Sequence, residues 1–361
     1  MSSELILPFL TPIAHFLKDD DVSEIMVNGT GRVFIERCGI IEAHDDIHLT
    51  NANLETSVKN IARVLGDEIS AQKPLLDGRL PDGSRVAAVL PPCSIGGITL
   101  TIRKFQNKRW TLQELVRTGA LPDVVRDRVA TAIANHKNIL IAGGTGTGKT
   151  TMLNALASLI PPSERLVVIE DTAEIQLTAP NLVRFEARKE QVSDNPDDHV
   201  PAITIRDLLK ASLRHRPDRI ILGEIRGGEA FDLLQALNTG HSGSLSTIHA
   251  NSAVQSVSRF SNCVLQSGIE IPHRAIQAQI ADALDFLLYI ERRHGKRYVA
   301  ELAELRGYNP QTDTYDIVPV YERDFAVAKD TKTTDLVALA AANPRSGPKI
   351  VRPMVGSPNH G

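Results

Sequence analysis

The residues with the clearest chemical potential lie in one glycine-rich stretch, GGTGTGKT, from Gly143 to Thr150. Its spacing fits the pattern G-x-x-x-x-G-K-[ST], with a short apolar run before it and a helix-type pattern after it. Glycines let the backbone curl so that successive N–H groups point at phosphate oxygens. The stretch therefore predicts an ATP-binding loop made of Gly143, Gly144, Thr145, Gly146, Thr147, Gly148, Lys149, Thr150 and Thr151.

Three residues of this loop are assigned to separate parts of the ligand. Lys149 is expected to place its charge on the β and γ phosphates, Thr150 to offer its hydroxyl to Mg²⁺, and Thr151 to bind a neighbouring phosphate. The bare pattern arises by chance in about one chain in a hundred of this length. The flanking strand, and a helix that Pro161–Pro162 ends, argue against the alternative of a simple glycine-rich turn.

Carboxylates at the ends of two further strand-like runs are candidates for catalysis. Glu224 ends RIILGE, where Gly223 stands in the place of the aspartate that usually ends a Walker B strand, and Glu170 and Asp171 end RLVVIED. We assign Glu224 to polarising the attacking water and Glu170 to supporting Mg²⁺ indirectly through water, and leave an exchange of these roles open. The alternative for Glu170 and Asp171 is that they cap the turn after their strand.

One histidine completes the set of candidates. His249 follows the apolar run SLSTI, and an imidazole at that place can sense a γ-phosphate. The alternative is a structural histidine that hydrogen-bonds to the backbone. The motifs around His249 favour the catalytic assignment.

The elements that must position these residues divide into domains. In residues 1–105, alternating apolar residues in EIMVNG, RVFIE and ITLTIRKF predict strands, and Leu54, Val58, Ile61 and Leu65 have helical spacing. This indicates a small α+β domain. A polar stretch with the lone Trp110, residues 106–120, is interpreted as a linker.

Residues 121–325 alternate helical patterns with short apolar runs. NILIAGG, RLVVIED, RIILGE and SLSTIHA read as strands, which predicts an α/β domain with a parallel-rich sheet covered by helices. The segment 187–200 reads as a long exposed loop. Residues 326–361, rich in Lys, Pro, Gly and Asn, are expected to form a flexible tail.

The composition limits which binding partners and which cellular compartment are expected for this protein. The 361 residues include 40 basic and 43 acidic side chains, with a net charge of −3, which gives no strong evidence for direct nucleic-acid binding. Three separated cysteines without a CxxC, Cys38, Cys93 and Cys263, favour a reducing cytoplasm. The apolar runs are too short to span a bilayer and the N-terminus does not resemble a secretory signal, so any membrane association is expected to be peripheral.

The motifs taken together resemble a known family. GGTGTGKTT, IEDTAE, LRHRPDRIILGEIRGGEAFDLLQALNTGH and STIHANS follow the order and spacing found in the traffic ATPases of type II and type IV secretion, conjugation and pilus assembly, and MVNG, VFIERCG and DGRLPDGSRV extend the similarity into the first domain. The resemblance is strongest to type IV secretion and conjugation ATPases and to CpaF-like Tad pilus motors.

The resemblance implies a RecA-like ATPase domain, a hexameric ring and nucleotide bound between the two domains. It implies a motor on the cytoplasmic face of the inner membrane that acts on membrane-embedded secretion or pilus platform proteins. By position it implies a Walker A role for Lys149 and Thr150, an acidic box with Glu170 and Glu174, an atypical Walker B motif ending in Glu224, and a histidine box with His249.

The first domain also contributes residues under this resemblance. Arg85 and Arg103 match arginines that reach the γ-phosphate, and Arg79 is a weaker match. An arginine placed on developing negative charge can supply about 10³ to 10⁵ in rate. The alternative for each is a solvated surface arginine.

Missing features separate branches of the family. There is no paired CxxC, which many type II secretion members carry, so type IV secretion or conjugation is favoured. A Tad pilus motor stays an alternative, because the stretch from Gly227 to Ser252 is similar to those motors. A nucleotide-gated scaffold with little turnover and a nucleic-acid translocase are the competing functions of other classes.

Overall fold

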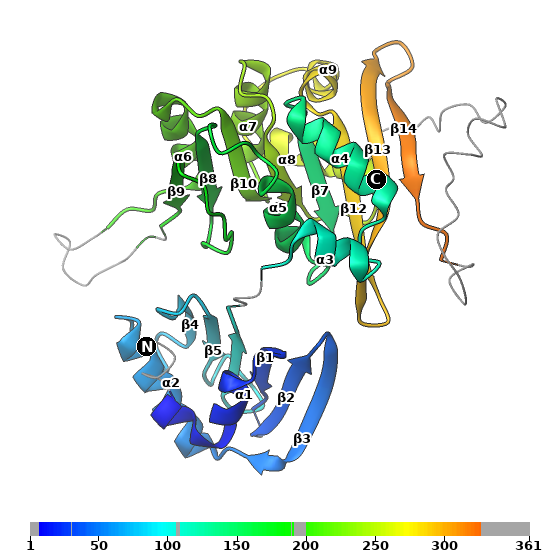
Figure 1. Cartoon of the computed structure of the whole chain (residues 1–361). Helices are drawn as coiled ribbons and strands as arrows, with labels where there is room; N and C mark the ends of the chain where they lie inside the picture. Colours follow the sequence, from blue (N-terminus) through cyan, green and yellow to red (C-terminus); the bar gives the residue numbers. More distant parts are fainter. Residues whose placement is uncertain (1–6, 30, 106–108, 189, 191–199, 326–361) are drawn as a thin grey trace, which may run out of the picture. The chain divides into compact units, whose positions relative to one another are not determined.

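The computed structural model describes residues 7–29, 31–105, 109–188, 190 and 200–325 (Figure 1). The chain divides into two compact units, Met1–Lys108 and Arg109–Gly361. The first has one hydrophobic core and the second has two. The expected tail at 326–361 and most of the expected loop at 187–200 lie outside the described residues.

The first unit contains an antiparallel sheet with the strand order β3-β2-β1-β6-β5-β4. Helix α2 confirms the helical pattern read from the sequence, because Leu54, Val58 and Ile61 are fully buried on one side of it. Thr50 caps this helix by accepting a hydrogen bond from the backbone N–H of Asn53 at 3.2 Å. The elements of the unit are η2 (Leu7–Ile13), α1 (Ala14–Lys18), β1 (Val22–Val27), β2 (Arg32–Arg37), β3 (Ile40–His48), α2 (Asn51–Val64), β4 (Leu75–Arg79), β5 (Arg85–Val89) and β6 (Thr99–Arg103).

The second unit contains an eight-stranded sheet with the order β14-β13-β12-β7-β11-β10-β8-β9. Neighbours from β12 to β9 run parallel, as the sequence predicted, and β13 and β14 extend the sheet as antiparallel strands. The strands are β7 (Ile139–Gly143), β8 (Leu166–Glu170), β9 (Leu182–Glu186), β10 (Arg219–Ile225), β11 (Leu245–Ile248), β12 (Phe286–Arg293), β13 (Lys296–Asn309) and β14 (Thr314–Glu322). The antiparallel extension was not part of the sequence-based prediction.

Helices cover both faces of this sheet (Figure 1). One face packs against α3 (Leu112–Arg117), α4 (Asp123–Ala134) and α5 (Lys149–Ala157). The other packs against α6 (Ile205–Ser212), α7 (Glu229–Asn238), α8 (Ala253–Leu265) and α9 (His273–Ala283), and η4 (Leu213–His215) follows α6. Cover on both faces explains why all five residues of β7 and all five of β8 are buried.

The stretch interpreted as a linker, 106–120, contains helix α3. Thr111 and Glu114 form a capping box, in which each side chain accepts a hydrogen bond from the other residue's backbone N–H. Leu112 and Leu115 are buried in a core of the second unit, and Trp110 packs against the same core. Local capping and three apolar side chains thus hold residues 110–115 of this stretch against the core of the second unit.

Within those described ranges, no helix combines the length and the apolar character needed to cross a membrane.

A largely buried ion pair at the start of β10 gives a prediction about stability. Arg219, at the start of β10, is fully buried and binds both carboxylate oxygens of Glu164, at 2.5 and 3.0 Å. Glu164→Gln removes the counter-charge of a desolvated guanidinium, which costs about 3–5 kcal/mol. We expect the melting temperature of the second unit to fall by about 10 °C in calorimetry. The matched variant Glu270→Gln, at an exposed carboxylate, should melt like the parent chain, and an equal melting temperature for both variants would contradict this account.

Candidate nucleotide-binding site

The glycine-rich loop connects the end of β7 to the start of α5. Gly146 and Gly148 have φ values of 69° and 93°, a region that residues with side chains rarely adopt. Thr147 Oγ1 donates a hydrogen bond to the carbonyl oxygen of Gly144 at 2.9 Å and closes the loop. A Cβ atom on Gly143 would lie 2.5 Å from that same Oγ1 atom. The glycines are therefore required by the loop conformation itself.

Lys149 lies folded onto this loop with only 9% of its surface exposed. Its Nζ atom donates to the carbonyl oxygens of Gly143 and Gly144, at 3.2 and 3.0 Å, and lies 3.3 Å from His249 Nε2. Burial lowers the pKa of Lys149, and the nearby Glu224 carboxylate, 4.0 Å away, acts in the opposite direction. A partly desolvated ammonium group held by two backbone carbonyl oxygens is one that a phosphate can bind in their place.

Thr150 and Thr151 lie half-buried in the first turn of α5, directly after Lys149. The free N–H groups and the positive end of the helix dipole are located at this turn. Both hydroxyl groups therefore lie at the N-terminal end of α5, which is the end that favours anions. Thr145, at the tip of the loop, is exposed.

A β-bulge in β10 changes the direction of Glu224. Leu222 pairs with Ser246 of β11 and Ile225 pairs with Ile248, so Gly223 and Glu224 together occupy the space opposite one residue, Thr247. Thr247 Oγ1 donates to the carbonyl oxygen of Gly223 at 2.6 Å and holds this irregular step. Bulges re-aim side chains next to functional sites. Here the bulge allows Ile225 to pack in the same core as Leu222, three residues earlier.

The Glu224 carboxylate is held from two sides. Its Oε1 atom lies 2.7 Å from His249 Nε2, and its Oε2 atom accepts from the guanidinium of Arg226 at 2.5–2.6 Å. Burial, followed by the charge of Lys149, lowers the pKa of His249, while Glu224 raises it. The lowered pKa favours the neutral imidazole, and a proton on Nε2 would point at the Glu224 carboxylate.

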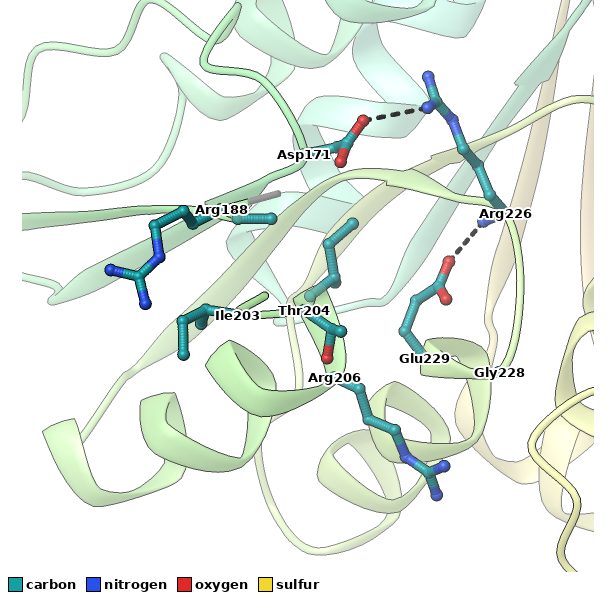
Figure 2. A pocket seen from close by; sticks show the side chains of 10 residues that line it. Asp171, Arg188, Ile203, Thr204, Arg206, Arg226, Gly228 and Glu229 are labelled. Atoms are coloured by element: carbon teal, nitrogen blue, oxygen red, sulfur yellow. Dashed lines mark hydrogen bonds and ion pairs between the residues drawn. The ribbon is translucent and has the colours of Figure 1, made fainter. Parts of the chain in front are cut away.

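Arg226 also reaches a second acidic strand end. Its guanidinium lies 3.2 Å from Asp171 Oδ2, and Figure 2 shows this pair at one side of a pocket that Arg188 and Arg206 also line. The backbone N–H of Arg226 donates to Glu229 Oε1 at 2.6 Å. Arg226 thus links the ends of β8 and β10, and sequence reasoning did not single it out. Its place two residues after Glu224 in GEIR was the available signal.

Glu170 is placed differently from Glu224. It is 3% exposed, and its Oε1 atom accepts the backbone N–H groups of Glu174 and Ile175, both at 2.7 Å, while Oε2 lies 3.3 Å from Arg184. Burial raises the pKa of Glu170, and these donors oppose the rise. These contacts match the turn-capping alternative. A role near Mg²⁺ stays a prediction for Glu170.

A steric constraint explains why residue 223 is a glycine, and the sequence alone did not reveal it. A Cβ atom at this position would lie 3.1 Å from Cγ of Glu170 on the neighbouring strand. An aspartate, the usual residue at this place, would therefore press on a buried side chain.

Glu174, next in the acidic box, lies close enough to Lys149 for its charge to oppose the lowering of that lysine's pKa.

The arginines of the first unit form a row. Arg79 lies opposite Arg85 in the pairing of β4 with β5, and Arg85 lies opposite Arg103 in the pairing of β5 with β6. Arg85 is 3.8 Å from Asp77 and Arg103 is 3.6 Å from Glu24. Three arginines from two separate stretches of sequence, DGRLPDGSRV and ITLTIRKF, are thus neighbours on one sheet.

A parallel-rich sheet with a G-x-x-x-x-G-K-[ST] loop after β7, a histidine after the neighbouring β11 and a carboxylate in β10 defines the class of α/β P-loop proteins. Residues 10–294 match the family described as "Type II/IV secretion system protein", and the chain belongs to this family. The resemblance drawn from the motifs is thereby confirmed.

Individual relatives agree with this assignment. The chain is 37% identical over 308 residues to the conjugal transfer protein TrbB of Rhizobium radiobacter, covering 83% of this chain and 89% of the relative. It is 36% identical over 311 residues to the type IV secretion system protein PtlH of Bordetella pertussis, covering 80% and 90%. The ATPase DotB of Legionella pneumophila shares the fold, with a TM-score of 0.56 and 20% identity over 81% of this chain and 79% of DotB.

Proposed function

We propose that this protein hydrolyses ATP in the presence of Mg²⁺ and is the ATPase of a type IV secretion or conjugation machine. The observation that carries the proposal is the convergence of Lys149 Nζ, Glu224 Oε1 and His249 Nε2 within 4.0 Å of one another at the end of the phosphate loop. The names of the relatives, conjugal transfer protein and type IV secretion system protein, support the choice of machine.

The residues of the loop fit a nucleotide that carries a metal ion. Lys149 offers a desolvated ammonium group, and the glycines hold a loop conformation into which side chains do not fit. Thr150 would hold Mg²⁺ through its hydroxyl, with Glu170 or Glu174 acting through water. Bound Mg²⁺ would neutralise charge on the β and γ phosphates.

The remaining steps belong to the side chains around Glu224. In this proposal Glu224 accepts a hydrogen bond from the attacking water and orients it, since a carboxylate in hydrogen-bond reach of water can act as a base. Neutral His249 donates a hydrogen bond from Nε2 to Glu224. When a nucleotide binds, the same N–H group can donate to a terminal phosphate oxygen instead. Lys149 leaves the carbonyl oxygens of Gly143 and Gly144 for the phosphates, because a charged acceptor binds it more strongly.

The direct test is steady-state phosphate release by the purified full chain with Mg·ATP. We expect turnover that rises with protein concentration more steeply than in direct proportion, because we propose that the RecA-like unit works in a ring of six subunits. Tight ATP binding without turnover at any protein concentration would instead favour the nucleotide-gated scaffold.

The cellular setting is also part of the proposal. We place the ring in the cytoplasm, peripheral at the inner face of the inner membrane and bound to platform proteins of the machine. A coupling receptor and a relaxase encoded nearby would support conjugation, whereas pilin and prepilin-peptidase neighbours would favour the Tad pilus alternative. Salt-sensitive stimulation of turnover by single-stranded DNA would favour the translocase alternative.

The arginine row gives a prediction for the first unit. We propose that Arg85 and Arg103 supply positive charge to the γ-phosphate, so each alanine variant should lower kcat about 10- to 100-fold, the range for one lost charged hydrogen bond. ATP affinity should change by less than about threefold if the contact forms mainly in the transition state. Arg63→Ala, an exposed arginine on α2 of the same unit, is the matched control. Equal kcat values for all three variants would remove the assignment.

A further inference from the structure

A basic hairpin lies against the phosphate loop on the side away from His249. β12 runs parallel to β7 with Ile290 opposite Gly143, so the residues after Ile290 follow the same edge of the sheet as the loop. The atom nearest to a Cβ built on Gly146 is NH1 of Arg292, at 3.4 Å, and a Cβ on Gly148 would lie 3.2 Å from Cδ of Arg297. Both arginines therefore border the glycines that shape the loop.

A tight turn fixes the two arginines as a pair. His294 and Gly295 have φ values of 48° and 75°, which is the signature of a two-residue hairpin turn with a primed geometry. The pairing that results places Arg292 directly opposite Arg297. Like charges in this position repel each other. An anion bound near both guanidinium groups would offset that repulsion.

The two arginines differ in their relation to the loop. The Nε atom of Arg297 donates a hydrogen bond to the carbonyl oxygen of Gly146 at 2.9 Å, so Arg297 supports the loop conformation. Arg292 is half-buried beside the same glycine. Arg293 contacts other groups, because it forms an ion pair with Glu291 at 2.5 Å and lies 3.9 Å over the Phe325 ring.

The strand order indicates which end of a nucleotide these residues meet. β7 lies between β11, which His249 follows, and β12, which carries Arg292. If the terminal phosphate lies with Lys149, Glu224 and His249, the nucleoside end of the phosphate chain lies toward the β12 side of the loop. The phosphate charges on that side are common to ATP and ADP, because they remain after the γ-phosphate has left.

We propose that Arg292 binds the phosphate nearest the nucleoside, with Arg297 as a positioning residue that holds the loop for it. The inference rests on the proposed function. It adds a specific consequence, which is that the hairpin increases the binding affinity for ATP and for ADP by the same factor. It separates residues that bind any adenine nucleotide from residues that distinguish ATP from ADP.

The test is equilibrium titration of the full chain with Mg·ADP and Mg·ATP in a Glu224→Gln background, which prevents turnover. Arg292→Gln should weaken both nucleotides about 10- to 100-fold, the range for one lost charged hydrogen bond, and the two losses should agree within about threefold. Arg297→Gln should weaken both about threefold to tenfold. Arg292→Lys should recover part of the affinity, because it restores the charge.

Arg293→Gln, on the same hairpin but bound to Glu291 and Phe325, is the matched control and should bind both nucleotides like its parent. ADP affinity within twofold of the parent in Arg292→Gln would overturn the inference, and so would a loss confined to ATP, because that result would place Arg292 at the γ-phosphate. If the parent binds neither nucleotide, the proposed function fails together with this assignment. Normal binding by the parent with an unaffected Arg292 variant overturns the inference alone.

Discussion

Glu224→Gln should lower kcat for ATP hydrolysis by about 10³-fold while ATP still binds within about threefold of the wild-type affinity. Glutamine keeps the size of the side chain and, through its one carbonyl oxygen, can accept from either Arg226 or His249, but it cannot take a proton from water. The substitution therefore slows the chemical step and leaves ATP binding nearly unchanged. Phosphate release and equilibrium binding of Mg·ATP, measured on the same preparation, give the two numbers.

The matched control for this variant is Glu322→Gln, which neutralises an exposed carboxylate at the end of β14. We expect wild-type turnover from it. Glu170→Gln and Glu174→Gln, measured in parallel, address the exchange of roles between the carboxylates. If Glu224→Gln retained wild-type turnover while Glu170→Gln lost it, the water-activating role would move to Glu170.

Lys149→Ala should abolish detectable binding of Mg·ATP at concentrations that saturate the wild type, and with it phosphate release. The ammonium group is the single buried cation that the described part of the phosphate loop itself provides, and charge-assisted bonds to phosphate are the strongest class of protein hydrogen bond. Binding and turnover should therefore disappear together, unlike the separation expected for Glu224→Gln.

Lys137→Ala is the control for loss of a lysine. That residue lies just before β7 and forms an exposed ion pair with Asp285 at 2.8 Å, a type of contact that contributes about 1 kcal/mol or less. It should bind and hydrolyse ATP normally. Undiminished turnover in Lys149→Ala would remove the phosphate site from this loop.

The parts of the site that sequence reasoning found are those encoded in contiguous residues. The loop from Gly143 to Thr151 needs glycines at fixed spacings between a strand and a helix, and those requirements are visible in a string of letters. The helix through Leu54 and Ile61 and the parallel strands were found for the same reason, since their periodicity is local.

The parts that sequence reasoning did not find depend on pairing between distant segments. The β10 bulge exists because β11 offers one residue where β10 has two, and neither strand alone carries that information. The partners of Glu170 include Arg184 on β9, and the contact between Arg226 and Asp171 joins two strand ends. The row of Arg79, Arg85 and Arg103 likewise needed the strand register of the first unit.

The extra residue in β10 makes the number of residues in this strand as important as their identity. Deleting Gly223 would let the strand pair regularly, with Ile225 still on its present face, so the sheet would assemble with its apolar layers intact. Glu224 would then take a regular strand position opposite Thr247 and point with Ile221 into the layer that contains α5. Such a shortened chain would keep the fold of its parent but lose ATP turnover, because the one-residue shift would move the Glu224 carboxylate out of its present contacts, 4.0 Å from Lys149 Nζ and 2.7 Å from His249 Nε2.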